Sequence, residues 1–95
     1  MEIKTTGSKV TIKGNIKSIS DYQNIKSALD TMKSSTKHIT VVLEESISII
    51  SSVIGYLNKL VLKDNVDLEI IVHDDNLYDL FDDLGLIQLF KVKRV

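Results

Sequence analysis

The sequence predicts an α/β domain whose mixed β-sheet is mostly parallel. Short runs of β-branched and apolar residues alternate with segments long enough for amphipathic helices, and two of the strand-like runs adjoin each other at the start of the chain. Strands that alternate with helices favour a parallel sheet with right-handed crossovers, and two strands joined by a tight turn add an antiparallel edge. The predicted order of elements is β-β-α-β-α-β-α-β.

Length and composition indicate a single globular domain over residues 1–95. Of these residues 43% are hydrophobic and 26% are charged, and the chain contains no proline. A second domain does not fit this length, and the composition argues against disorder. Cysteine is absent, which excludes disulfides, thiolate metal sites and cysteine nucleophiles.

The first third of the chain predicts a hairpin followed by a helix. Residues 2–5 and 9–13 alternate polar and apolar side chains, and Gly7-Ser8 supplies the turn between them. Ser20-Asp21-Tyr22-Gln23 has the form of a capping box, so we expect Ser20 to cap the first helix. The apolar face of that helix recurs at spacings of three and four residues and comprises Tyr22, Ile25, Leu29 and Met32.

The middle of the chain predicts a buried strand and a second helix. Residues 39–43 form a nearly continuous apolar run, which is typical of a central strand covered on both faces. After a segment that includes Ile47-Ser48-Ile49-Ile50, we expect Ser51 or Ser52 to cap the helix and Asn65 to end it in a left-handed conformation. The predicted inner face comprises Ile54, Leu57, Leu60 and Val61, with Val53 at its edge.

The last third predicts a strand, a helix and a final strand. Residues 68–72 form the next buried strand, and Asp74, Asp75 or Asn76 is expected to cap the third helix. Gly85 stands where that helix should stop, and residues 86–93 predict the final strand. The inner face of the third helix is expected to comprise Leu77, Leu80, Phe81 and Leu84.

The motifs give no support to catalysis, a metal or a nucleic acid. No glycine-rich phosphate loop, histidine-paired nucleophile or pair of facing carboxylates is recognisable, so we assign no catalytic residue. His38 and His73 lack the spacing of a metal site, and the aspartates of residues 74–83 lack the calcium-loop pattern, so we expect no cofactor. The net charge of −1 and the scattered lysines argue against a nucleic-acid partner.

The pattern of apolar residues also bears on localisation. The first residues lack the apolar core of a signal peptide, and the longest uncharged apolar run, residues 46–57, is too short to cross a bilayer. We therefore expect a cytoplasmic protein that does not insert into membranes.

The order of elements resembles that of the STAS family, the fold of bacterial anti-sigma-factor antagonists, over almost the whole chain. Gly14-Asn15-Ile16 is similar to the family's Gly-x-Leu segment, and residues 77–86 followed by Leu89-Phe90 are similar to its closing helix and final strand. Residues 50–55, Ile-Ser-Ser-Val-Ile-Gly, lie where the family has Asp-Ser-Ser-Gly-Leu-Gly. Ile50 and Val53 depart from that motif.

The resemblance implies that the second helix binds a protein partner. In the family, a serine at the start of this helix is phosphorylated by a kinase that is also an anti-sigma factor, and the unphosphorylated antagonist binds that kinase. The resemblance marks Ser51 and Ser52 as phosphorylation candidates and places partner contacts at Ser51, Ser52, Val53, Gly55 and Tyr56. A phosphoserine there would meet the positive end of the helix dipole and would repel an acidic or apolar partner surface.

Other interpretations stay open at this point. One alternative is that Ser51 and Ser52 cap the helix and have no further role. Because Ile50 replaces the family's aspartate, the chain can also be an adaptor that is never phosphorylated, for example a subunit of a lipid-transport ATPase. A small-molecule or nucleotide binding module is the competing class. Gly55 costs a helix about 0.5–1 kcal/mol relative to alanine, so we expect either a neighbouring backbone or a partner to approach it closely.

Overall fold

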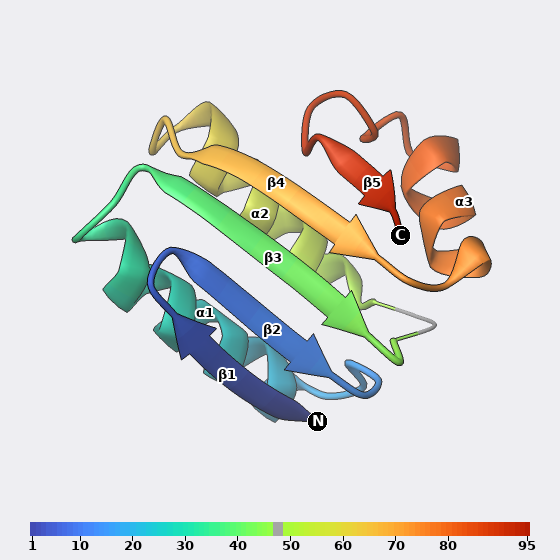
Figure 1. The fold of residues 1–95 in the computed structure, drawn as a ribbon, viewed down its shortest axis with the longest axis horizontal. Helices are drawn as coiled ribbons and strands as arrows, with labels where there is room; N and C mark the ends of the chain where they lie inside the picture. Colours follow the sequence, from blue (N-terminus) through green and yellow to red (C-terminus); the bar gives the residue numbers. More distant parts are fainter. Residues whose placement is uncertain (47–48) are drawn as a thin grey trace.

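The computed structural model describes residues 1–46 and 49–95, which form one five-stranded sheet and three helices (Figure 1). The strands are β1 (Glu2–Thr6), β2 (Lys9–Lys13), β3 (His38–Glu44), β4 (Asp67–Val72) and β5 (Val92–Arg94), and the helices are α1 (Ile19–Lys33), α2 (Ser51–Leu62) and α3 (Asp75–Asp83). The sheet order is β1-β2-β3-β4-β5, with β1 antiparallel to β2 and the other pairings parallel. The predicted fold class and order of elements are confirmed.

The N-terminal hairpin turns at Gly7-Ser8, as predicted. Gly7 has a φ of +59°, a left-handed conformation that glycine adopts without steric cost. The turn sets the register of the hairpin, which places Glu2 opposite Lys13 and Thr6 opposite Lys9. The remaining strands run parallel to β2, so the carboxyl ends of β2, β3 and β4 meet at one edge of the sheet.

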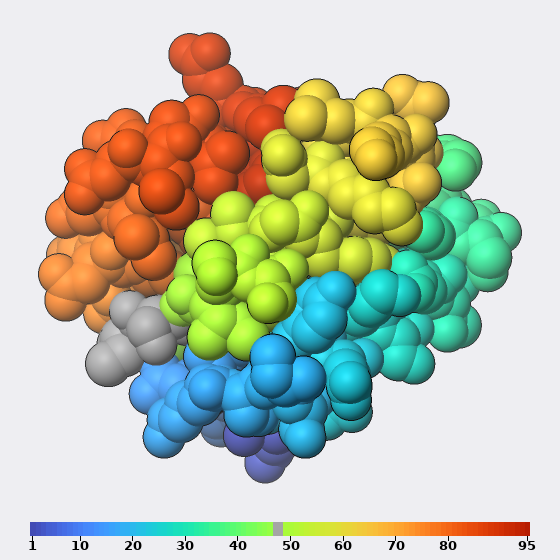
Figure 2. Space-filling view, turned by 180° about the vertical axis from the view of Figure 1, so that it is seen from behind, coloured from blue at the N-terminus to red at the C-terminus, as the bar shows by residue number. Residues whose placement is uncertain are grey.

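The helices lie on one face of the sheet, which makes a two-layer structure (Figures 1 and 2). Alternate strand residues, such as Val10 and Val41, point into the core between the two layers. The expectation that β3 is covered on both faces is wrong, because no helix among the described residues covers its other face. Val42 points to that face and is still only 6% exposed, because Thr11 and Ile71 flank it on the neighbouring strands.

Helix α1 begins two residues earlier than the sequence predicts. Ser18 caps it, and its Oγ accepts the backbone N–H of Asp21 at 3.1 Å. The Asp21 carboxylate in turn accepts the N–H of Lys17 at 2.9 Å, so Ser18 and Asp21 each satisfy a backbone N–H at the helix start. Ser20, the predicted cap, lies inside the helix. The predicted inner face is confirmed for Ile25, Leu29 and Met32, which are buried, while Tyr22 is partly buried.

The C-terminal strand is shorter than predicted. Instead of residues 86–93, only β5 (Val92–Arg94) joins the sheet, and the chain before it forms turns in which Phe90 N–H donates to the Leu86 carbonyl at 3.0 Å. The apolar residues of this run reach the core from irregular backbone, and the fully buried Phe90 ring meets the Phe81 ring edge-on at 6.2 Å. A hydrophobic run of this length therefore indicates burial without specifying a strand.

Helix α3 follows the prediction at its ends and departs from it on its face. Asp74 caps it by accepting the N–H of Leu77 at 3.0 Å, and Gly85, with a φ of +71°, follows its end. Leu77 and Phe81 are buried and Leu80 is partly buried, as expected. The expected burial of Leu84 is wrong, because Leu84, at the C-cap position of the helix, is 50% exposed and lies outside the core.

We predict that Phe90→Ala lowers the free energy of unfolding by about 3–5 kcal/mol, because it opens a cavity beside Phe81. Urea titration followed by circular dichroism measures the change. Leu84→Ala is the matched control and should change stability by less than about 1 kcal/mol, because its side chain is half exposed. Equal losses in the two variants would contradict this description of the core.

Candidate functional site

The first turn of α2 begins directly at Ser51, on the helical face of the molecule between α1 and α3 (Figure 2). Ile50 occupies the cap position in an extended conformation, and its carbonyl accepts the N–H groups of Val53 at 3.1 Å and Ile54 at 3.3 Å. The expectation that Ser51 or Ser52 caps this helix is wrong, because these serines are its first and second residues. Their hydroxyl groups are therefore not committed to the capping bond.

A buried side chain attaches the segment before α2 to the sheet. Ser46 is fully buried, and its hydroxyl donates to the Gly14 carbonyl at 2.6 Å. This bond joins the chain after β3 to the chain after β2 near the carboxyl ends of both strands. Ile47 and Ser48 of the predicted Ile47–Ile50 run lie outside the described residues, whereas Ile49 and Ile50 belong to neither a helix nor a strand.

The five residues assigned to partner binding divide into two groups. Ser51, Ser52 and Gly55 are exposed, so the first turn presents them to the surroundings. Val53 and Tyr56 are only 2% and 5% exposed, and their side chains belong to the core. A partner that docks on this turn would therefore meet the two hydroxyl groups and the bare backbone at Gly55.

Gly55 is not required by packing within the described chain. A Cβ placed on this residue would meet no atom within 4 Å apart from its own helix and its chain neighbours. The expectation that a neighbouring backbone approaches Gly55 closely is therefore wrong, and approach by a partner stays a prediction. The helix carries the cost of glycine at a position that faces open space.

The electrostatics of this helix start differ from those of the other two helices. Helices α1 and α3 have side-chain caps and an acidic residue in the first turn, Asp21 and Asp75 respectively. Helix α2 has neither a side-chain cap nor an acidic residue there. Its positive dipole end is thus not offset locally, which is the setting in which an added phosphate is stabilised.

The inner side of α2 is joined to α1 by a polar cluster around Tyr56. The Tyr56 hydroxyl donates to the Asp30 carboxylate, which also pairs with Lys26 at 2.9 Å and Lys33 at 3.4 Å. Lys33 reaches Asp64, just beyond α2, at 3.0 Å. Sequence analysis missed this role of Tyr56, although the spacing of Val53, Tyr56, Leu57 and Leu60 already marks them as one helical face.

The cluster shifts the pKa values of its members in opposite directions. Burial alone would raise the pKa of Asp30, but the hydrogen bonds from Tyr56, Lys26 and Lys33 outweigh burial and lower the pKa to about 2. Burial and the adjacent Asp30 carboxylate raise the pKa of Tyr56 far above its ordinary value. Tyr56 therefore stays protonated and Asp30 ionised at neutral pH, so the bond between the helices persists.

A hollow lies at the carboxyl ends of the parallel strands, where α/β sheets usually bind ligands. It has a volume of about 410 Å³ and is lined by Lys13, Glu44, Glu45, His73 and Asp74. No group of three or more potential ligands is arranged for a metal ion within residues 1–46 and 49–95. His38 lies at the other end of its strand and pairs with Asp67 at 3.0 Å, so the two histidines are not brought together.

Comparisons with known proteins add no family or relative. No protein-family model matches the chain, and neither the curated proteins nor the solved structures gave a match. The resemblance to STAS proteins therefore stays an expectation from the sequence motifs and the order of elements. Within the described part of the chain, no helix is both long enough and apolar enough to span a membrane.

We predict that Tyr56→Phe destabilises the protein by about 1–2 kcal/mol at pH 7, because a charge-assisted hydrogen bond is lost and Asp30 keeps one donor fewer. In a double-mutant cycle with Asp30→Asn, measured by urea unfolding, the two changes should not add. The stabilisation from Asp30 should be complete above pH 4 and disappear as the pH falls through about 2, because its pKa is lowered on folding. Additive changes would contradict the cluster, and Asp82→Asn, which alters an exposed carboxylate, is the control.

Proposed function

We propose that this chain is a regulatory domain that acts like a STAS anti-sigma-factor antagonist and binds a kinase-type anti-sigma factor through the first turn of α2. The observation that carries the proposal is the exposure of Ser51, Ser52 and Gly55 on a helix start without a side-chain cap. The two hydroxyl groups and the bare backbone at Gly55 allow a partner surface to approach closely. The domain acts in the cytoplasm by binding and carries out no catalysis itself.

Phosphorylation of Ser51 or Ser52 would switch this interaction. Each serine lies in the first turn, where backbone N–H groups and the helix dipole favour an anion, so the phosphate is tolerated without unfolding the helix. The added charge of about −1.5 to −2 would oppose binding to an acidic or apolar partner surface. Both serines are exposed, so both remain acceptor candidates.

The second candidate function is a constitutive adaptor that uses the same helix face, for example in a lipid-transport ATPase. Ile50 favours it, because an apolar side chain before Ser51 cannot orient a hydroxyl group for phosphate transfer. The nucleotide-binding alternative has less support. The hollow at the carboxyl ends of the strands is lined by three carboxylates, of Glu44, Glu45 and Asp74, against the one lysine Lys13, so its excess of negative charge opposes a phosphate group.

We predict that incubation with its kinase-type partner and ATP adds one phosphate, detected by intact-protein mass spectrometry. Ser51→Ala or Ser52→Ala, made singly, should abolish the addition for the acceptor and leave it intact for the other. Ser20→Ala, which removes an exposed serine of α1, is the control. If no partner adds mass, the switch is refuted, whereas binding measured by pull-down would still support the adaptor.

We predict that Gly55→Arg abolishes partner binding and leaves the fold intact, because the new side chain extends into open space from the docking turn. Pull-down measures binding, and thermal unfolding checks the fold. Leu62→Arg is the matched control, since it adds the same charge to an exposed position in the last turn of the same helix. Binding that survives Gly55→Arg would exclude this face as the docking site.

A further inference from the structure

The outer edge of β1 is a free sheet edge within the described chain. Strand β1 ends the sheet order and pairs only with β2. Its two-residue turn at Gly7-Ser8 is closed by the pair Thr6 and Lys9, and such a closing pair is hydrogen-bonded. Because hydrogen-bonded and non-hydrogen-bonded pairs alternate, Glu2 and Lys4 direct their backbone groups to β2. The backbone groups of Ile3 and Thr5 therefore point away from the sheet.

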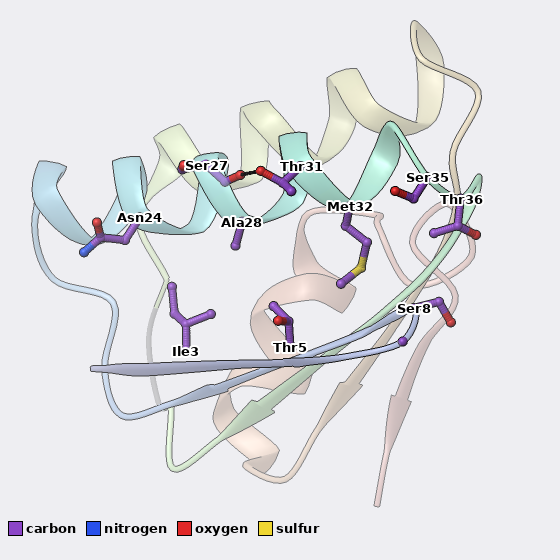
Figure 3. A pocket seen from close by; sticks show the side chains of 11 residues that line it. Ile3, Thr5, Ser8, Asn24, Ser27, Ala28, Thr31, Met32, Ser35 and Thr36 are labelled. Atoms are coloured by element: carbon purple, nitrogen blue, oxygen red, sulfur yellow. Dashed lines mark hydrogen bonds between the residues drawn. The ribbon is translucent and has the colours of Figure 1, made fainter.

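A groove lies beside this edge on its helical side (Figure 3). It has a volume of about 740 Å³ and separates β1 from α1. Ile3 and Thr5 point into it from the strand, and Ala28 and Met32 point into it from the helix. All of its lining side chains are uncharged. A strand added to β1 would place alternate side chains in this groove, where apolar groups fit.

The charges on β1 select both the added strand and its register. Glu2 and Lys4 lie on the same face of the sheet, opposite to Ile3. If a second β1 pairs antiparallel with Ile3 opposite Ile3 of the other copy, each Glu2 lies opposite a Lys4. A shift of two residues in either direction sets two Lys4 or two Glu2 side chains against each other, which is unfavourable. Only the register centred on Ile3 forms two cross-strand ion pairs.

The same register satisfies the backbone. Ile3 directs its N–H and carbonyl outward, so the two Ile3 residues exchange two hydrogen bonds across the twofold axis, and Thr5 faces Met1 of the second copy in the same way. The side chains of Ile3 and of the exposed Met1 from the second copy then enter the groove beneath α1. Hydrogen bonding, charge pairing and apolar burial thus agree on one arrangement.

We infer that a second copy of this chain binds at β1, so that two five-stranded sheets join antiparallel about a twofold axis centred on Ile3. The dimer is independent of the partner proposed for α2. Helix α2 packs against β4 and α1, away from the outer edge of β1 (Figure 1). The interface is small, so we expect a reversible dimer instead of a permanent one.

Cysteine cross-linking tests the register, because the chain has no cysteine of its own. Paired residues at a hydrogen-bonded position have Cα atoms about 5.5 Å apart, which a disulfide spans. Ile3→Cys should therefore form a covalent dimer under mild oxidation, seen on non-reducing gels. Thr5→Cys and Lys4→Cys are the controls and should link much less, because neither residue faces its own copy. Linking of Lys4→Cys in preference to Ile3→Cys would overturn the inference.

Charge exchange tests the ion pairs by sedimentation. The unmodified chain should dimerise reversibly with rising concentration, and Glu2→Lys or Lys4→Glu alone should weaken the dimer at least tenfold, because each sets like charges in opposition. The double variant with both exchanges should restore dimerisation, because it inverts both pairs. A chain that stays monomeric at every concentration, or a double variant no better than the single ones, would overturn the inference.

Discussion

The one-sided burial of the sheet is the constraint on which the rest of the structure depends. Every inner strand must send alternate residues toward the helices, and the same residues pair across strands, as Val10, Val41 and Ile70 do. Because each crossover has the same hand, the helices follow one another across a single face. The opposite face then carries mainly polar residues with cross-strand ion pairs, such as Lys93 with Glu69 at 2.8 Å.

This constraint also determines what α2 can present. Its buried side is committed to the core by Val53, Leu57 and Leu60, and to α1 by Tyr56. The exposed residues at the helix start, Ser51, Ser52 and Gly55, are small and uncharged, so no large or charged side chain among them blocks a partner. Because the buried side of α2 is fixed to the core, its exposed side is preorganised. A partner would therefore not need to order the first turn of α2 on binding.

Much of the fold was predictable because its signals are local. Alternation in residues 9–13 and the glycine of the turn specified the hairpin, and spacings of three and four specified the helix faces that include Leu29 and Phe81. Two of the errors occurred where two local patterns competed. Ser18 and Ser20 each lie three positions before an acidic or amide residue, so both fit the capping pattern. The path of the chain into the helix selected Ser18 as the cap. The composition of the apolar run before β5 fits a strand as well as it fits buried turns. In the structure the run forms turns, and its Phe90 packs against Phe81.

The candidate site was proposed from the sequence, and the structure determines which of its residues are exposed. The motif around Ser51 and Ser52 falls on the first turn of α2. Only the tertiary arrangement decided that Tyr56 faces Asp30 and that, among the residues the structure describes, Gly55 faces open space and the outer edge of β1 is free. The sequence by itself determined the order and type of elements, because backbone preference and apolar periodicity act over a few residues. The tertiary structure decided which side chains are exposed and which pair with each other. These properties depend on residues such as Asp30 and Tyr56, which are distant in the chain and adjacent in space.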